Sequence, residues 1–155
     1  MLLLELIFQK PNIQCPRCLG KGNVDDQDIA RLRKQLFWQP GKCAFCNGKG
    51  KTYEAVINQI PEGLSYLHCH LSAIERWRLI NGNKNAFERA KEYEELVKNL
   101  AYSFAKQYYD EGADVRKIAE TYFSEVAKTK ANDEEKNNLA RYIDKVVEFY
   151  KDELI

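Results

Sequence analysis

Four cysteines lie in two copies of one eight-residue pattern, C-x-x-C-x-G-x-G, at residues 15–22 and 43–50. Thiolates are strong zinc ligands, and a C-x-x-C turn lets two sulfurs approach one ion together. Two such turns supply the four ligands that zinc prefers in tetrahedral geometry, about 2.3 Å from the ion. The sequence therefore predicts one zinc site, formed by Cys15, Cys18, Cys43 and Cys46.

The two glycines of each copy have a mechanical role in this site. After the second cysteine the chain must fold back so that backbone N–H groups face the sulfurs. Glycine tolerates the positive φ angles that such turns require. We therefore expect left-handed backbone after Cys18 and again after Cys46.

A zinc ion with four protein ligands has no position left for a catalytic water, which favours a structural role. The sequence also shows no Ser/His/Asp order, phosphate loop or nucleotide-binding fingerprint. We therefore expect a protein that is not an enzyme. Thiol–disulfide exchange at the CxxC pairs stays open as an alternative, although zinc-bound thiolates are weakened nucleophiles.

The duplicated pattern resembles the cysteine-rich zinc region of DnaJ-type chaperones, which usually carries four such repeats and two zinc centres. The resemblance extends to Ile60-Pro61-Glu62-Gly63, which is similar to a segment that follows that region, and covers about residues 10–64. The two-repeat arrangement also looks like the zinc module of the small bacterial anti-TRAP regulators. No His-Pro-Asp tripeptide occurs, so the J-domain is missing. The resemblance implies a chaperone-like, protein-binding zinc finger.

Composition changes near Pro61, before which lie the other three prolines and five of the eight glycines. We expect an α+β protein with a zinc-stabilised, β-hairpin-like module at 1–62 and an antiparallel bundle of about four helices at 63–155. The module should hold strands at Leu2–Phe8 and Thr52–Ile60, with a helix inserted at Asp25–Trp38.

Apolar residues recur at three- and four-residue spacing in the second part, which predicts four amphipathic helices. The first should contain Leu64 to Trp77 and end at Asn81-Gly82-Asn83, and the second should run from Phe87 to Tyr108. The third should span 115–126. The fourth should begin at a capping pattern, Asn132-Asp133-Glu134-Glu135, and reach Tyr150.

Three smaller features of the sequence are weaker signals of function. His68, Cys69 and His70 diverge if they lie on a helix, so we expect an ordinary, at least half-buried Cys69. Trp77 is expected in the core, between solvated arginines. A third feature is a basic rim around the zinc turns, which offers a nucleic-acid contact and consists of Lys10, Arg17, Lys21, Lys42, Lys49 and Lys51.

The leading hypothesis is a zinc-stabilised adaptor or chaperone-like accessory whose partner is a protein or an unfolded polypeptide. The alternative is a zinc-dependent nucleic-acid-binding regulator, but 24 basic against 23 acidic side chains demand no such partner. No segment approaches the roughly 20 apolar residues of a membrane span. Five cysteines without an export signal indicate a reducing, cytoplasmic setting. A homo-oligomer is compatible with all of this.

Overall fold

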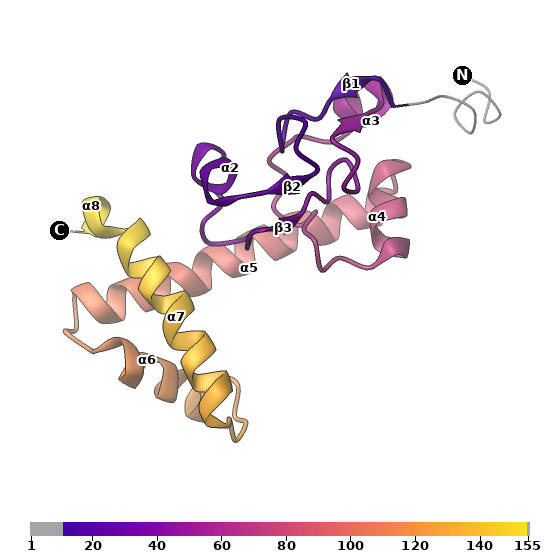
Figure 1. Ribbon diagram of the computed structural model, residues 1–155. Coiled ribbons are helices and arrows are strands. Elements are labelled where there is room, and N and C mark those ends of the chain that lie inside the picture. Colours follow the sequence, from indigo (N-terminus) through magenta and orange to yellow (C-terminus); the bar gives the residue numbers. More distant parts are fainter. Residues whose placement is uncertain (1–10, 155) are drawn as a thin grey trace. The chain divides into compact units, whose positions relative to one another are not determined.

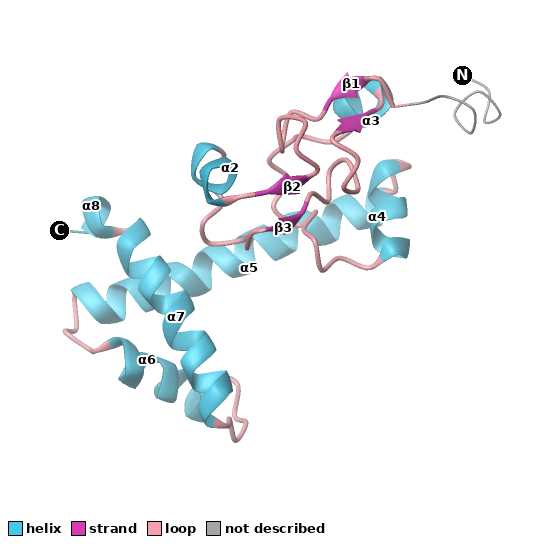
Figure 2. Cartoon of the chain, viewed as in Figure 1, coloured by secondary structure: helices cyan, strands magenta, loops and turns pink. Residues whose placement is uncertain are grey.

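The computed structural model describes residues 11–154 and divides the chain into two compact units, Met1–Glu94 and Glu95–Ile155. The first unit contains two small antiparallel sheets together with helices, and the second is helical (Figures 1 and 2). The α+β class predicted from the sequence is therefore confirmed. The strand expected at Leu2–Phe8 lies outside the described residues.

The two sheets join the flanks of one cysteine repeat to the flanks of the other. Strand β1 (Ile13–Gln14), which enters the first repeat, pairs with β4 (Lys51–Thr52), which leaves the second. Strand β2 (Asn23–Val24) leaves the first repeat and pairs with β3 (Gly41–Lys42), which enters the second. This reciprocal pairing places the two C-x-x-C turns side by side.

Helix α2 (Asp26–Arg31) is shorter than the predicted Asp25–Trp38. It begins at a capping box in which Asp25 accepts from the N–H of Asp28 and Asp28 accepts from the N–H of Asp25. It ends because Arg33 adopts a left-handed φ of 56°, while the N–H of Lys34 bonds to the carbonyl of Ile29 at 2.9 Å.

The strand expected at Thr52–Ile60 is wrong beyond Thr52, because helix α3 (Glu54–Gln59) follows. Val56 and Ile60, four residues apart, are both buried in the core of the first unit. The Gln59 amide also donates to two carbonyls at the end of the next helix. Tertiary packing thus outweighs the β propensity of this segment.

Helix α4 (Ala73–Ile80) begins later than the periodicity predicted, where Ser72 accepts the N–H of Glu75. Residues 64–71 form turns instead of helix. The carbonyls of Leu64 and Leu67 accept hydrogen bonds from a buried guanidinium, which ties this segment to the first cysteine repeat. The helix ends as expected, at Gly82 with φ 76°.

The metal-site region and the helices that follow it share one hydrophobic core. The four repeat cysteines belong to it, and α3, α4 and the start of α5 (Lys84–Tyr109) contribute to it as well. Their buried members in this core are Val56, Leu79, Ala86 and Ala90, and Ile60, directly after α3, is buried beside them. The boundary between the two compact units therefore follows Glu94. The expected boundary at 62/63 was based on the composition change near Pro61 and lies earlier in the chain.

The second unit follows the predicted helices closely. The later part of α5 is joined by α6 (Val115–Thr121), a π-helical turn (Tyr122–Val126), α7 (Asp133–Phe149) and α8 (Lys151–Leu154). The expected capping box of α7 is present between Asn132 and Glu135. Helix α6 packs against α7 around buried side chains that include Phe104, Ile118, Ile143 and Val146.

No helix within residues 11–154 combines the length and apolar character that crossing a bilayer requires.

Replacing Ile143 with alanine should destabilise the second unit by about 2–5 kcal/mol, because the side chain is fully buried and truncation leaves a cavity. The control is Leu96→Ala, which removes an exposed side chain from the same unit and should change stability by less than about 0.5 kcal/mol. Denaturant unfolding followed by circular dichroism measures both. Equal effects of the two substitutions would contradict this core assignment.

Candidate metal centre

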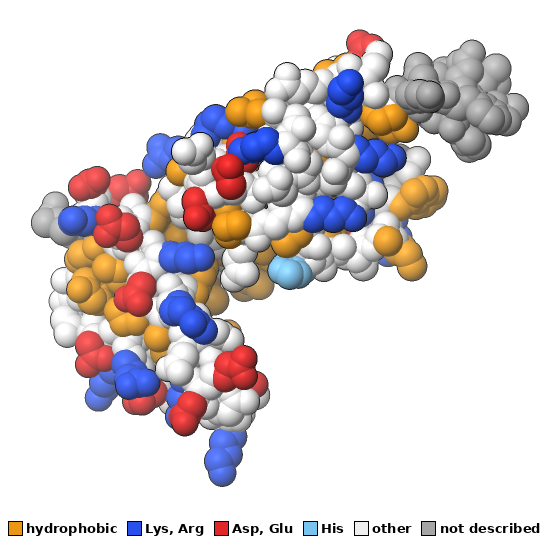
Figure 3. Space-filling view, in the orientation of Figure 1, with side chains coloured by type: hydrophobic (Ala, Val, Ile, Leu, Met, Phe, Trp, Pro, Cys, Tyr) orange, Lys and Arg blue, Asp and Glu red, His pale blue; other side chains and the backbone are white. Residues whose placement is uncertain are grey.

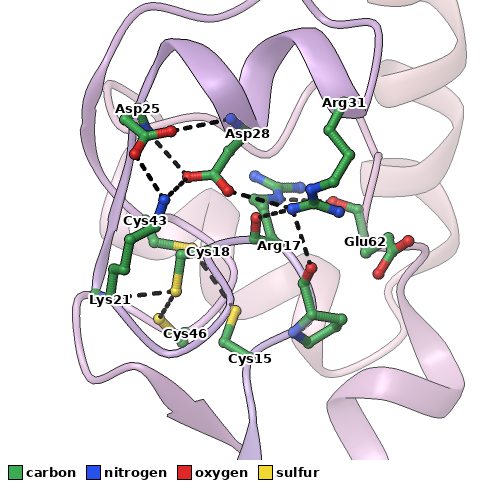
Figure 4. Close-up of polar contacts among 12 residues, drawn as sticks. Cys15, Arg17, Cys18, Lys21, Asp25, Asp28, Arg31, Cys43, Cys46 and Glu62 are labelled. Carbon is green, nitrogen blue, oxygen red and sulfur yellow. Dashed lines mark hydrogen bonds and ion pairs between the residues drawn. The ribbon is translucent and has the colours of Figure 1, made fainter.

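The structure brings the four predicted cysteines together. Figure 4 shows the four side chains pointing toward one another. All four are buried, and their sulfurs lie within 4.8 Å of one another. The Sγ atoms of Cys15 and Cys43 are 3.8 Å apart, and those of Cys18 and Cys46 are 3.7 Å apart. Each close pair therefore joins one repeat to the other.

These separations fit a metal ion and not a disulfide. Disulfide sulfurs lie about 2.05 Å apart, far closer than either pair here. Four thiolates at about 2.3 Å from a central zinc ion, at the corners of a tetrahedron, lie about 3.8 Å from one another. The cluster thus has the dimensions of a four-thiolate site, and all four positions are filled by protein.

The raised pKa values of two of the four thiols also favour a bound cation at this site. The contact with Cys15, together with burial, raises the pKa of the Cys43 thiol above its ordinary value. Burial raises the pKa of Cys18, although the N–H of Gly22 acts in the opposite direction. Thiols so close to one another ionise together only when a positive ion offsets their charge.

The turns that follow each cysteine pair adopt the expected left-handed backbone. Leu19 and Gly20 have φ of 54° and 89°, and Asn47 and Gly48 have 55° and 79°. The last glycine of each repeat then donates its N–H to the sulfur of the second cysteine in the same repeat. Gly22 reaches the Sγ of Cys18 at 3.3 Å, and Gly50 reaches that of Cys46 at 3.2 Å. These N–H groups stabilise thiolate charge.

The final glycine of each repeat also packs against the other repeat. A Cβ on Gly22 would lie 2.6 Å from the carbonyl oxygen of Gly48, and one on Gly50 would collide with the carbonyl of Gly20. The N–H of Cys15 donates to Gly50 at 2.9 Å, and that of Cys43 donates to Gly22 at 3.0 Å. The two turns therefore interlock through their backbones.

Arg17 does not belong to a basic rim, because its side chain is only 1% exposed. Its guanidinium donates to the carbonyls of Glu62, Leu64 and Leu67 and stacks 4.1 Å from the ring of Trp38. The sequence interpretation was wrong here because a basic residue between two cysteines looks the same in sequence whether it faces solvent or the core.

The buried charge of Arg17 is a second argument for a metal ion. Burial lowers its pKa to about 10, which still leaves a cation at neutral pH. The groups that oppose this shift most strongly are Cys43, Cys15 and Cys46, ahead of the Glu62 carboxylate. A buried cation is costly without a nearby negative charge. A divalent ion with four thiolates carries a net charge of −2 and supplies it.

The remaining cations near the site form a weaker rim than the sequence suggested. Lys21 lies 2.7 Å from carboxylate oxygens of both Asp25 and Asp28. Lys42, Lys49 and Lys51 are exposed, and Lys10 lies outside the described residues. On the face drawn in Figure 3, the basic side chains of the first unit are scattered among uncharged and acidic surface.

His68, Cys69 and His70 lie in a turn, not on a helix, and the N–H of His70 donates to Nδ1 of His68 at 3.2 Å. Cys69 is exposed, so the expectation of a buried or half-buried thiol is wrong. The three residues line a hollow of about 200 Å³ together with Trp38 and Tyr93. Among the described residues they are not part of a metal-binding cluster.

Helix α4 faces the core differently from the expectation. Trp77, expected inside, is 65% exposed, whereas Arg76 is half-buried and Glu75 is buried. Glu75 forms an ion pair with Arg89 of α5 at 2.7 Å and accepts from Tyr66 at 3.2 Å. These partners turn the Glu75 face of α4 inward and leave Trp77 outside. No spacing in the sequence signals the pairing of Glu75 with Arg89.

Comparison with family models, with curated proteins and with solved structures finds no match for this chain. The likeness to DnaJ-type zinc regions rests on the residues of the two repeats.

Gly50→Ala should weaken metal binding, because the added Cβ collides with the backbone of the other repeat and the residue has φ 76°. Gly112→Ala is the matched control, since Gly112 has a similar φ of 70° but nothing within 4 Å of the new atom. Each substitution carries a backbone cost of roughly 1–2 kcal/mol, and only the first should lower metal affinity in a chelator competition. Equal affinities for both variants would refute the interlock.

Removing the metal should unfold the first unit, because a four-thiolate site supplies on the order of 10 kcal/mol of apparent binding energy. Cys43→Ser should act like a chelator, whereas Cys69→Ser, outside the cluster, should keep the metal. Circular dichroism should show a partial loss of helix, since α6 and α7 belong to the second unit. Complete loss of helix, or none, would contradict the division.

Proposed function

We propose that this chain is a zinc-stabilised protein-binding module, an adaptor or chaperone-like accessory, with zinc as its one structural ion. Four thiolates in tetrahedral arrangement favour zinc, and the C-x-x-C spacing is that of structural zinc sites. The sulfurs are buried and occupy every ligand position, so a substrate has no route to the ion. In this proposal the centre supports the fold and performs no catalysis.

The observation that carries protein binding is a pair of exposed apolar side chains on α4. Ile74 and Trp77 are 64% and 65% exposed and stand three residues apart, on one face of the helix. Tryptophan is among the side chains that most often dominate the energy of protein interfaces. Isolated exposed apolar residues are common, but a tryptophan beside an isoleucine forms a two-residue anchor.

The metal centre can hold this anchor in place. Arg76, between Ile74 and Trp77, donates to the carbonyls of Ala44 and Phe45 inside the second cysteine repeat. The second cysteine turn and helix α4 are thereby joined by direct hydrogen bonds. The partner that suits such an anchor is an unfolded polypeptide segment with apolar side chains, in keeping with the DnaJ-like repeats.

The two alternatives have less support. Nucleic-acid binding through the basic rim would lack Arg17, which is buried in the core. It would also depend on Lys21, which already pairs with two carboxylates. Thiol–disulfide exchange needs accessible sulfurs, and the four in the cluster are buried. Cysteines that hold zinc and an exposed fifth thiol fit a reducing compartment such as the cytoplasm.

The test is the binding of a reduced, unfolded test polypeptide, measured by fluorescence anisotropy. Replacing both Ile74 and Trp77 with alanine should weaken binding by at least tenfold, in line with the loss of an interface anchor. Leu96→Ala, which removes an equally exposed side chain from the second unit, should leave binding unchanged. Metal content should match the wild type in both. No binding by the wild type, or equal binding by the double variant, would refute the role.

A further inference from the structure

Two arginines from different helices grip equivalent positions of the two zinc turns. Arg31 of α2 donates from Nη2 to the carbonyl of Arg17 at 2.7 Å and to that of Pro16 at 3.4 Å. Figure 4 shows this side chain reaching the turn between Cys15 and Cys18. These two carbonyls belong to the first and second residues after Cys15, the first cysteine of the repeat.

Arg76 of α4 repeats this arrangement on the second turn. Its Nε donates to the carbonyl of Ala44 at 3.0 Å, and its Nη2 donates to that of Phe45 at 3.3 Å. Ala44 and Phe45 are again the first and second residues after the first cysteine. The octapeptide repeat does not contain either clamping arginine, so their equivalence arises only in the folded chain.

The clamped carbonyls matter because each shares a peptide group with the N–H of the following residue, inside the turn between the two cysteines of its repeat. The carbonyls of Ala44 and Phe45 belong to the same peptide planes as the N–H groups of Phe45 and Cys46. The N–H groups of Phe45 and Cys46 act to lower the pKa of the Cys43 thiol, against the raising effects of Cys15 and of burial. A guanidinium on the carbonyl side polarises the peptide group and fixes its orientation.

We propose that Arg31 and Arg76 are positioning residues of the metal centre, each clamping the two carbonyls between the cysteines of one repeat. The clamp directs the N–H groups of the turn to the sulfurs and places positive charge behind them. This inference rests on the zinc binding proposed above and assigns the residues that tune it.

The two clamps differ in strength. Arg31 is 38% exposed and also contacts the Asp28 carboxylate at 3.3 Å, so part of its charge is already balanced. Arg76 is half-buried, and the hydrogen bonds that its guanidinium makes go to the turn itself. Together with the buried Arg17, it offsets the charge of −2 on a divalent ion with four thiolates. We therefore expect Arg76 to matter more.

The experiment measures zinc affinity by competition with a chromophoric chelator for the full chain and its variants. Arg76→Gln should lose about 10- to 100-fold in affinity, the range found when outer partners of metal ligands are removed. Arg31→Gln should lose less. Arg78→Gln is the control, because Arg78 lies on the same helix and contacts Glu75 instead of the turn. Its affinity should stay within about twofold of the wild type.

A second measurement separates tuning of the sulfurs from simple support of the fold. Thiolates that lose polarised N–H partners protonate more readily, so Arg76→Gln should release the metal at a higher pH during acidification. The sulfur-to-metal charge-transfer band of the cobalt-loaded protein should shift as well. Arg76→Lys, which keeps the charge but not the two-carbonyl fork, should restore part of the difference.

The outcomes are distinguishable. If the wild type binds no zinc, the proposed zinc-stabilised function itself fails. If the wild type binds and Arg76→Gln matches Arg78→Gln in affinity, the clamp is refuted. It is also refuted if Arg76→Gln loses affinity but keeps the release pH and cobalt spectrum of the wild type. Arg31→Gln alters a more exposed side chain on α2 and serves if Arg76→Gln folds poorly: an affinity below that of Arg78→Gln supports the clamp, and an affinity equal to it refutes the clamp.

Discussion

The interlock between the two C-x-x-C turns is the constraint on which the first unit depends. Gly22 and Gly50 each lie against a carbonyl of the opposite repeat, where any side chain would collide. Backbone hydrogen bonds from Cys15 and Cys43 cross between the repeats at the same place. The strand pairs β1–β4 and β2–β3 continue this reciprocity outward. The four sulfurs meet because the backbones that carry them can approach so closely.

Charge is the second organising factor, and it follows from the first. Once four thiols share one small volume, an ion is needed to ionise them, and the resulting centre is negative. The positively charged guanidinium groups of Arg17 and Arg76 donate hydrogen bonds to backbone carbonyls around this centre. Arg17 connects the first turn to residues 62–67, and Arg76 connects the second to α4. The two arginines thereby link segments outside the repeats to the cysteine turns.

Local sequence was sufficient wherever structure depends on neighbours along the chain. The repeated cysteines and glycines predicted the metal-binding turns, because their spacing encodes both the ligand geometry and the left-handed backbone. The capping box at Asn132 and Glu135 and the long apolar period of α5 predicted the helices of the second unit. These features are short-range, so a sequence shows them directly.

The tertiary structure decided which face each side chain presents. Thr52–Ile60 became mostly helix because Val56 and Ile60 found a core to fill. Arg17 was buried and Trp77 exposed because of partners far along the chain: the carbonyls of residues 62–67 for Arg17, and Arg89, which turns Glu75 of α4 inward. The sequence by itself determined the four ligands and the turns that carry them. Only the fold determined what surrounds them, since burial and charge pairing arise between segments that no local pattern connects.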